Sequence, residues 1–164
     1  MPGWFDLYDW PIAVGSKDDK QGLMEGVKTI GSIVDQLRTE GVQRIVVGGF
    51  SQGGAVALLS AYHPTGSSVD GCVALSGWLT LANELGTKAD RPPLFWGHGL
   101  YDDKVLFEQQ AYGLEKLSEA GASTIEADQY PIGHSSDSKE IRAMADFLVK
   151  VLFTEECAAA TNTK

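Results

Sequence analysis

The chain has 164 residues, of which 43% are hydrophobic and 21% charged, with a formal net charge of -9. This composition excludes disorder over the whole chain, and the length suits one domain that buries its own core. The acidic balance argues against a broad nucleic-acid interface and against attraction to anionic lipid, so we expect no nucleic-acid partner.

Three features bear on the compartment and on membrane association. The two cysteines, Cys72 and Cys157, are too few for a disulfide framework, and we interpret them as free thiols in a reducing environment. No stretch reaches the roughly 18 consecutive apolar residues of a membrane span, so we expect no stable membrane insertion. Residues 1–6 lack the basic and long apolar regions of a signal peptide, which makes a cytoplasmic location the expectation.

The N-terminal half begins with an irregular segment, because residues 1–15 are rich in aromatic side chains and carry two prolines. A helix follows, predicted by apolar residues at helical spacing, namely Leu23, Val27, Ile30, Val34 and Leu37. Gly41 ends that helix. Residues 44–50 (RIVVGGF) predict a strand without polar alternation, which is typical of a strand buried on both faces of a parallel sheet.

The remaining elements alternate between helix and strand. Small and apolar residues predict a helix over 51–62, and periodic apolar residues predict helices over 106–117 and 141–152. A capping-box pattern of Asp137 and Glu140 precedes the last helix. Buried strands are predicted over 72–75 and 93–97, and a fourth strand over 123–127.

This alternation predicts a mainly parallel sheet with helices on both faces, an α/β fold. In such sheets, functional residues lie at the carboxyl ends of the strands. No repeat or linker divides the chain, so we expect one domain over residues 1–153 and a flexible tail over 154–164.

The first predicted strand ends in a G-x-S-x-G pattern, GFSQG, over residues 49–53. The pattern alone is weak in a glycine-rich chain, and an incidental serine in a tight turn is the alternative. Its position between a buried strand and a small-residue helix is what a nucleophile elbow requires. Small neighbours at Gly49, Gly53 and Gly54 allow that sharp turn, so Ser51 is the candidate nucleophile.

A serine hydroxyl needs a base to take its proton, and the chain has three histidines. We expect His63 to be exposed at the end of the helix over 51–62. For His98, which follows the third strand, a role in shaping the loop is favoured. His134 lies after the fourth strand and follows both the nucleophile and a loop acid in sequence, so it is the candidate base. A surface-loop histidine is the alternative.

The acid that orients the histidine should come from the loop after the third strand, where Asp102 and Asp103 are both available. Its role is to hold the imidazole in one tautomer and to stabilise the imidazolium. Either residue could instead be a solvated turn aspartate, and sequence spacing does not separate neighbours.

Four segments in this order resemble the acyl-protein thioesterase family, also called the phospholipase/carboxylesterase family of α/β-hydrolases. They are GGFSQGG (48–54), LSGWL (75–79), HGLYDDKV (98–105) and GH (133–134). The opening PGWFD (2–6) also matches a family segment, and the resemblance covers residues 1–153. It implies an α/β-hydrolase-like, mainly parallel sheet flanked by helices that lacks the first strands of the family fold.

The resemblance also implies an activity, that of a serine hydrolase acting on acylated proteins, lysophospholipids or small esters, without a metal or organic cofactor. It assigns Ser51 as nucleophile, His134 as base and the N–H of Gln52 as an oxyanion donor. The family's His-Gly-x-x-Asp motif places the acid at Asp102. Family members usually have proline next, where this chain has Asp103, a second carboxylate that could compete for the imidazole.

Four apolar residues, Trp4, Trp78, Leu100 and Val105, resemble positions that line the family's acyl groove. Packing in the core is the alternative for each of them. Walls of this kind would bury a fatty chain at about 0.8 kcal/mol per CH₂.

One family feature is absent from this sequence. The PGWFD segment normally follows the first strands of the sheet and a His-Gly-x-Gly-Asp loop, whose backbone supplies an oxyanion donor. The only His-Gly pair here, His98-Gly99, belongs to the acid motif, so the Gln52 N–H is the one expected donor left. Loss of one such donor typically costs about 10²–10³ in kcat.

Without early strands, the strand over 44–50 has an unpaired edge, which invites self-association unless residues 1–15 cover it. Three explanations remain: a fragment or misassigned start of a longer product, a short isoform of weak or no activity, or a sheet completed by another chain. Two functional hypotheses follow. The first is a serine hydrolase, and the second is a non-catalytic protein that binds acyl chains or a partner chain.

Overall fold

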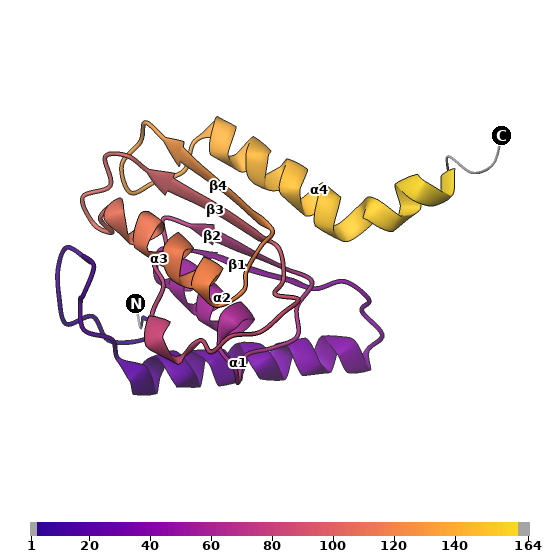
Figure 1. Ribbon diagram of the computed structural model, residues 1–164, viewed down its shortest axis with the longest axis horizontal. Helices are drawn as coiled ribbons and strands as arrows, with labels where there is room; N and C mark the ends of the chain where they lie inside the picture. Colours follow the sequence, from indigo (N-terminus) through magenta and orange to yellow (C-terminus); the bar gives the residue numbers. More distant parts are fainter. Residues whose placement is uncertain (1–2, 161–164) are drawn as a thin grey trace.

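The centre of the protein is a parallel sheet in the order β1-β2-β3-β4, seen in a computed structural model that describes residues 3–160, with side chains through residue 153 (Figure 1). The strands are β1 (Val46–Phe50), β2 (Gly71–Leu75), β3 (Leu94–Gly99) and β4 (Ile125–Tyr130). All four predicted strands are present, and β4 begins and ends later in the sequence than predicted.

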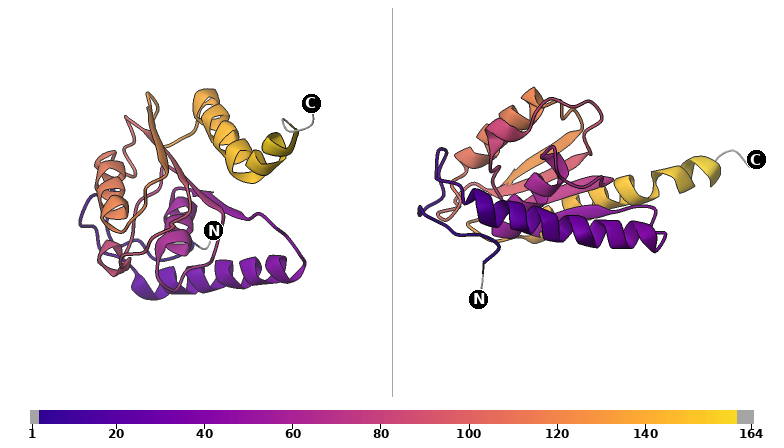
Figure 2. Two further views of the ribbon diagram at one scale, coloured as in Figure 1. Left: turned by 45° about the vertical axis from the view of Figure 1, so that its right-hand side comes forward. Right: turned by 90° about the horizontal axis from the view of Figure 1, so that it is seen from below.

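Helices cover both faces of the sheet, as the alternating pattern predicted. They are α1 (Lys20–Thr39), α2 (Gln52–Tyr62), α3 (Glu108–Glu119) and α4 (Ser138–Ala160), with a short 3₁₀ turn, η1 (Ala82–Glu84). The first three lie on one side of the sheet and α4 lies on the other (Figures 1 and 2). α2 packs directly on β1 and β2, and α1 covers α2.

The core forms where β2 and β3 meet helices on both sides. Every residue of these two strands is buried. On one face, Leu94 and Trp96 pack with side chains of α2 and α3; on the other, Phe95 stacks against Phe147 of α4 at 5.9 Å between ring centroids. Burial on both faces explains why neither strand alternates between polar and apolar residues.

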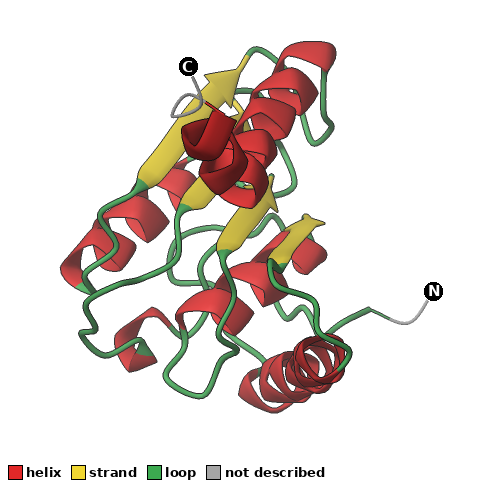
Figure 3. Cartoon of the chain, turned by 90° about the vertical axis from the view of Figure 1, so that its right-hand side faces the viewer, coloured by secondary structure: helices red, strands yellow, loops and turns green. Residues whose placement is uncertain are grey.

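β1 departs from the expectation of a strand buried on both faces. It lies at an edge of the row of strands seen in Figure 3, and Gly48 and Phe50 are exposed. The expectation is wrong for β1 because, within residues 3–160, no strand pairs with its outer side. The N-terminal segment does not fill that place: its β-bridge among the described residues joins Ile12 to Val105, in the loop after β3.

At the C-terminal end of the described chain, α4 continues to Ala160 and so passes the predicted domain limit at residue 153. Residues 161–164 of the predicted tail lie outside the described residues, and Cys157 lies beyond the described side chains.

Cys72 is fully buried in β2, and burial raises the pKa of its thiol. None of the helices in the described chain combines the length and apolarity needed to cross a membrane.

Candidate active site

Ser51 occupies the tight turn between β1 and α2, with φ 55° and ψ −122°. A positive φ is uncommon for a residue other than glycine and is held here by the surrounding structure. The Ser51 N–H donates to the Leu75 carbonyl at 2.9 Å, and its own carbonyl accepts from the Ala55 N–H at 3.1 Å. A side chain at Gly49 would overlap the Gly53 carbonyl. The local geometry is therefore that of the predicted nucleophile elbow.

His134 bridges Ser51 and Asp102. Its Nε2 lies 2.9 Å from Ser51 Oγ, and its Nδ1 lies 2.8 Å from Asp102 Oδ2. A carboxylate only accepts, so Nδ1 carries the proton and Nε2 is free to accept one from the serine. The ring of Phe50 packs against the imidazole at 4.8 Å between centroids. The carboxyl ends of β1, β3 and β4 thus bring the three predicted side chains together.

The environment distinguishes Asp102 from Asp103. Asp102 Oδ1 accepts the N–H groups of Lys104 and Val105, each at 2.9 Å, and its side chain is fully buried. Burial alone would raise the pKa of Asp102, but the hydrogen bonds from His134, Val105 and Lys104 lower that pKa below its usual value. Asp103 is exposed and pairs with the Lys104 ammonium at 3.0 Å. Only Asp102 faces the imidazole.

Of the other two histidines, His98 adjoins Asp102, with its Nε2 3.6 Å from Asp102 Oδ2, and His63 lies at the end of α2. His98 is fully buried and donates from Nε2 to the Val105 carbonyl at 2.9 Å, which braces the loop that carries Asp102. Burial lowers the pKa of His98, so the ring is neutral. The expectation of an exposed His63 is wrong: its side chain is 9% exposed, because it packs beside Thr65 and Glu84.

Gln52 is the first residue of α2, so its N–H has no acceptor within the helix and is available for the predicted role of oxyanion donor. Sequence reasoning missed what its side chain does. The amide accepts the Trp4 N–H at 3.2 Å and donates to the Phe5 carbonyl at 3.0 Å. Gln52 therefore ties the N-terminal segment to the helix end beside Ser51.

A hollow of about 640 Å³ lies beside Ser51 and Gln52, with apolar walls that include Trp4, Trp10 and Phe50. These three side chains are 45%, 61% and 41% exposed. Trp4 is thus the one predicted groove residue that lines this hollow. Trp10 was missed as a wall, although the aromatic richness of residues 1–15 was its signal.

The other three predicted groove residues lie elsewhere. Leu100 is exposed but does not line the hollow. Trp78 and Val105 are 4% and 1% exposed and belong to a core cluster with Phe5, whose ring meets Trp78 edge-on at 5.7 Å. For these two, the structure shows core packing. Within the described residues, no three His, Cys, Asp or Glu side chains gather closely enough to hold a metal ion.

Comparison with known proteins identifies the family of this chain. The model of the phospholipase/carboxylesterase family matches residues 1–152. The chain belongs to this family. It is 35% identical to the carboxylesterase SOBER1 of Arabidopsis thaliana, over 93% of this chain and 69% of that protein. It is 31% identical to acyl-protein thioesterase 1 of Aspergillus fumigatus, over 98% of this chain and 72% of that protein.

Solved structures in this phospholipase/carboxylesterase family show the same α/β-hydrolase fold over the shared part. The crystal structure of Arabidopsis thaliana SOBER1 matches with a TM-score of 0.81 and 33% identity, over 93% of this chain and 75% of that one. Zea mays acyl-protein thioesterase 2 gives a TM-score of 0.78 and 28% identity, over 92% and 72%. The chain spans 58% of a probable SOBER1-like carboxylesterase of Arabidopsis thaliana.

Proposed function

We propose that this chain is a serine hydrolase that cleaves acyl thioesters or esters through Ser51, His134 and Asp102. The observation that carries the proposal is the pair of hydrogen bonds, 2.9 and 2.8 Å long, that joins the strained serine through the imidazole to a buried carboxylate. A carboxylate held ionised by two peptide N–H groups can stabilise the imidazolium that forms when the serine loses its proton.

The steps follow from this geometry. Ser51 Oγ attacks the acyl carbon while His134 Nε2 takes its proton, and the oxyanion accepts the Gln52 N–H at the positive end of α2. His134 then gives the proton to the departing thiolate or alkoxide, which leaves an acyl-serine. In the second half of the reaction, His134 takes a proton from water while the water oxygen attacks the acyl carbon. His134 then returns that proton to Ser51 as the carboxylic acid departs.

The proposed substrates are S-acylated proteins, lysophospholipids or small esters in the cytoplasm. Relatives of this chain are named as carboxylesterases and acyl-protein thioesterases. The apolar hollow beside Ser51, walled by Trp4, Trp10 and Phe50, suits an acyl chain. Its burial would contribute about 0.8 kcal/mol per CH₂ to binding, which lowers KM more than it raises kcat.

Active-site labelling with a fluorophosphonate probe tests the proposal. We expect labelling of the native chain and none of Ser51→Ala, because the probe phosphonylates an activated serine. Ser32→Ala, which changes an exposed serine on α1, is the matched control and should label normally. Labelling of Ser51→Ala at the native rate, or folded native protein that does not label, would contradict the assignment.

The second candidate is a non-catalytic form that binds acyl chains or a partner chain. Two observations on the described residues favour it: the Gln52 N–H is the one oxyanion donor assigned among them, and none of their strands pairs with the outer side of β1. Turnover of p-nitrophenyl butyrate distinguishes the candidates. The hydrolase proposal expects Ser51-dependent release of p-nitrophenol, slower by up to about 10²–10³ than in a relative with two oxyanion donors, if no second donor assists here. Release indistinguishable from Ser51→Ala would support the non-catalytic form.

A further inference from the structure

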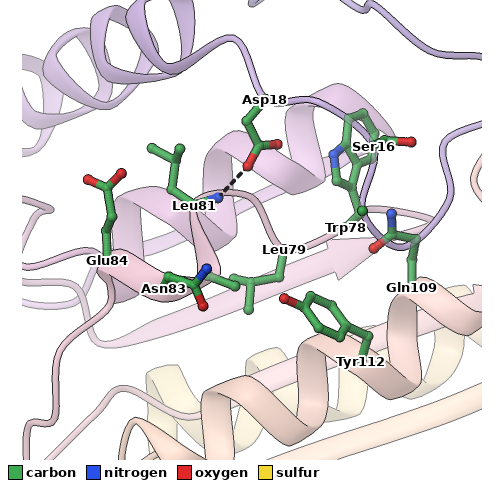
Figure 4. A pocket seen from close by; sticks show the side chains of 11 residues that line it. Ser16, Asp18, Trp78, Leu79, Leu81, Asn83, Glu84, Gln109 and Tyr112 are labelled. Atoms are coloured by element: carbon green, nitrogen blue, oxygen red, sulfur yellow. Dashed lines mark hydrogen bonds between the residues drawn. The ribbon is translucent and has the colours of Figure 1, made fainter.

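A second pocket lies apart from Ser51, His134 and Asp102. It has a volume of about 280 Å³ and is enclosed by the N-terminal loop before α1, the segment after β2 and the first turns of α3 (Figure 4). Its polar or aromatic lining includes Asp18, Trp78, Asn83, Glu84, Gln109 and Tyr112. None of these residues takes part in the proposed reaction.

Two buried side chains in this pocket have unused hydrogen-bonding groups. Gln109 is 4% exposed and points from α3 into the pocket (Figure 4), yet its amide makes no hydrogen bond within the described chain. Trp78 is equally buried, and its indole N–H also lacks an acceptor among residues 3–160. Neither group is among the fully buried atoms without a partner, so both reach the open space of the pocket and are available to a polar ligand.

The charge of the pocket indicates the sign of that ligand. Asp18 and Glu84 contribute carboxylates, but both oxygens of Glu84 accept from the Lys20 ammonium, at 2.9 and 2.8 Å, so Asp18 is the lining carboxylate without an ion pair within the described residues. Asp18 Oδ2 accepts the Leu81 N–H at 2.8 Å, and its other oxygen has no hydrogen bond in the described part of the chain. Burial raises the pKa of Asp18. The hydrogen bond from the Leu81 N–H lowers that pKa in part, and the nearby Glu84 raises it further. A cation in the pocket would offset the burial of the Asp18 carboxylate, which is the largest cause of its raised pKa.

Shape and lining narrow the class of ligand. The volume far exceeds the roughly 30 Å³ of one water molecule, so a group the size of an amino-acid side chain fits. The rings of Trp78 and Tyr112 border the pocket, and aromatic faces attract organic cations. Oxygen acceptors on Asp18, Asn83 and Gln109 suit a group with several N–H donors.

We propose that this pocket binds a primary ammonium group on a short carbon chain, with Asp18 as its counter-ion and the Gln109 carbonyl as a second acceptor. A lysine side chain and a small alkylamine share this chemistry. The proposal goes beyond the hydrolase assignment and does not depend on it, because binding can be measured without turnover.

Side-chain N–H signals in ¹H–¹⁵N NMR spectra of the full chain test the proposal. The probes are Nα-acetyl-lysine N-methylamide and ethylammonium chloride, at ionic strength matched with NaCl. We expect at least one of them to shift the Trp78 indole and Gln109 amide signals saturably, with a Kd on the order of 1 mM. The indole signal of Trp10, which is exposed and outside this pocket, should not move and is the internal control.

The neutral analogue and the variants decide between outcomes. Nα-acetyl-norleucine N-methylamide lacks the ammonium and should bind at least about fivefold more weakly than the lysine derivative or ethylammonium. Asp18→Asn should weaken ammonium binding by at least about fivefold, while Asp35→Asn, on the exposed face of α1, should not. If Asp18→Asn does not fold, Gln109→Leu replaces it with the same expectation.

Each result bears on the proposal. Binding of ethylammonium alone identifies a free small amine as the ligand, and binding of the lysine derivative identifies a peptide side chain. Absence of saturable shifts with both probes would overturn the proposal. Equal affinity for the norleucine analogue, or native affinity in the folded variants, would overturn it as well.

Discussion

Asp102 and Asp103 are identical side chains next to each other, yet their surroundings differ completely. Asp102 is buried against His134 and accepts two peptide N–H groups of its own loop. Asp103 points to solvent, where its pairing with Lys104 contributes little. The selection of one carboxylate comes from loop backbone geometry, so the second carboxylate does not compete for the imidazole.

This contrast gives a prediction for the pair of amide variants. Asp102→Asn should lower kcat/KM by about 10⁴, because an amide in this position can hold the imidazole in the wrong tautomer. Asp103→Asn should stay within about twofold, because its side chain touches no reacting group. Steady-state hydrolysis of p-nitrophenyl butyrate checks both. A large loss in Asp103→Asn, or none in Asp102→Asn, would contradict the placement.

Gly49 shows a second residue whose role depends on close packing. A side chain there would overlap the Gly53 backbone, and neither β1 nor α2 can shift without disturbing the elbow. We expect Gly49→Ala to destabilise the protein by about 2 kcal/mol or more, as overpacking does. Gly31→Ala in α1 is the matched control, because its methyl group would meet only Ser67 Oγ, at 3.4 Å. Helix propensity predicts that this change raises the free energy of unfolding by about 0.5–1 kcal/mol. Urea unfolding measures both, and equal effects would contradict the argument.

At the scale of elements, the start of α4 forms only half of the predicted capping box. Asp137 Oδ1 accepts the N–H groups of Lys139 and Glu140, each at 2.9 Å. The Glu140 side chain turns inward instead and is fully buried beside Gly97 of β3. Burial raises the pKa of Glu140, the nearby Asp137 raises it further, and Ser136 lowers it in part. The helix start thus places an acid in the interior.

This buried acid predicts a pH dependence of stability. Because the pKa of Glu140 is higher in the folded state, the unfolded chain loses this proton first as pH rises. Stability is therefore lost between the unfolded and folded pKa values, and the full penalty remains above both. Glu140→Gln should exceed the native protein by on the order of 1 kcal/mol at pH 7, with the difference shrinking toward pH 4. Urea unfolding at both pH values measures this, and a difference that grows toward acid pH would contradict it.

On the scale of the whole molecule, the two edges of the sheet differ. The β4 edge carries Glu126 and Asp128, and charges on an edge strand discourage pairing with another chain. The β1 edge has no charged residue, and an apolar groove that includes Val46, Phe50 and Leu148 lies beside it. The Ser51 N–H points to β2, so alternation along the strand directs the backbone groups of Val46, Gly48 and Phe50 outward.

We therefore propose self-association through β1, with a second copy of this chain as the partner. The apparent mass should rise with protein concentration in size-exclusion chromatography with light scattering. Val46→Pro should suppress that rise, because it removes an outward N–H at the first residue of the strand without removing a bond to β2. A monomer at all concentrations, or undiminished association of folded Val46→Pro, would contradict the proposal.

Structure that depends on neighbouring residues could be predicted from the sequence, and structure that depends on contacts between distant segments could not. Periodic apolar residues and glycine stops were enough to predict the alternating elements, and the GFSQG turn predicted the elbow, because helix, strand and turn preferences act over a few residues. The family was predicted separately, from the resemblance of four motifs and their order to a known family. The family resemblance had already placed the acid at Asp102 and left one edge of the strand over 44–50 unpaired, and the structure shows both among the described residues. Tertiary contacts decided that Trp78 and Val105 pack in the core while Trp4 and Trp10 face the hollow, and that the side chain of His63 is covered. Each of these depends on loops and neighbours far away in the sequence, and burial is set only when those segments meet.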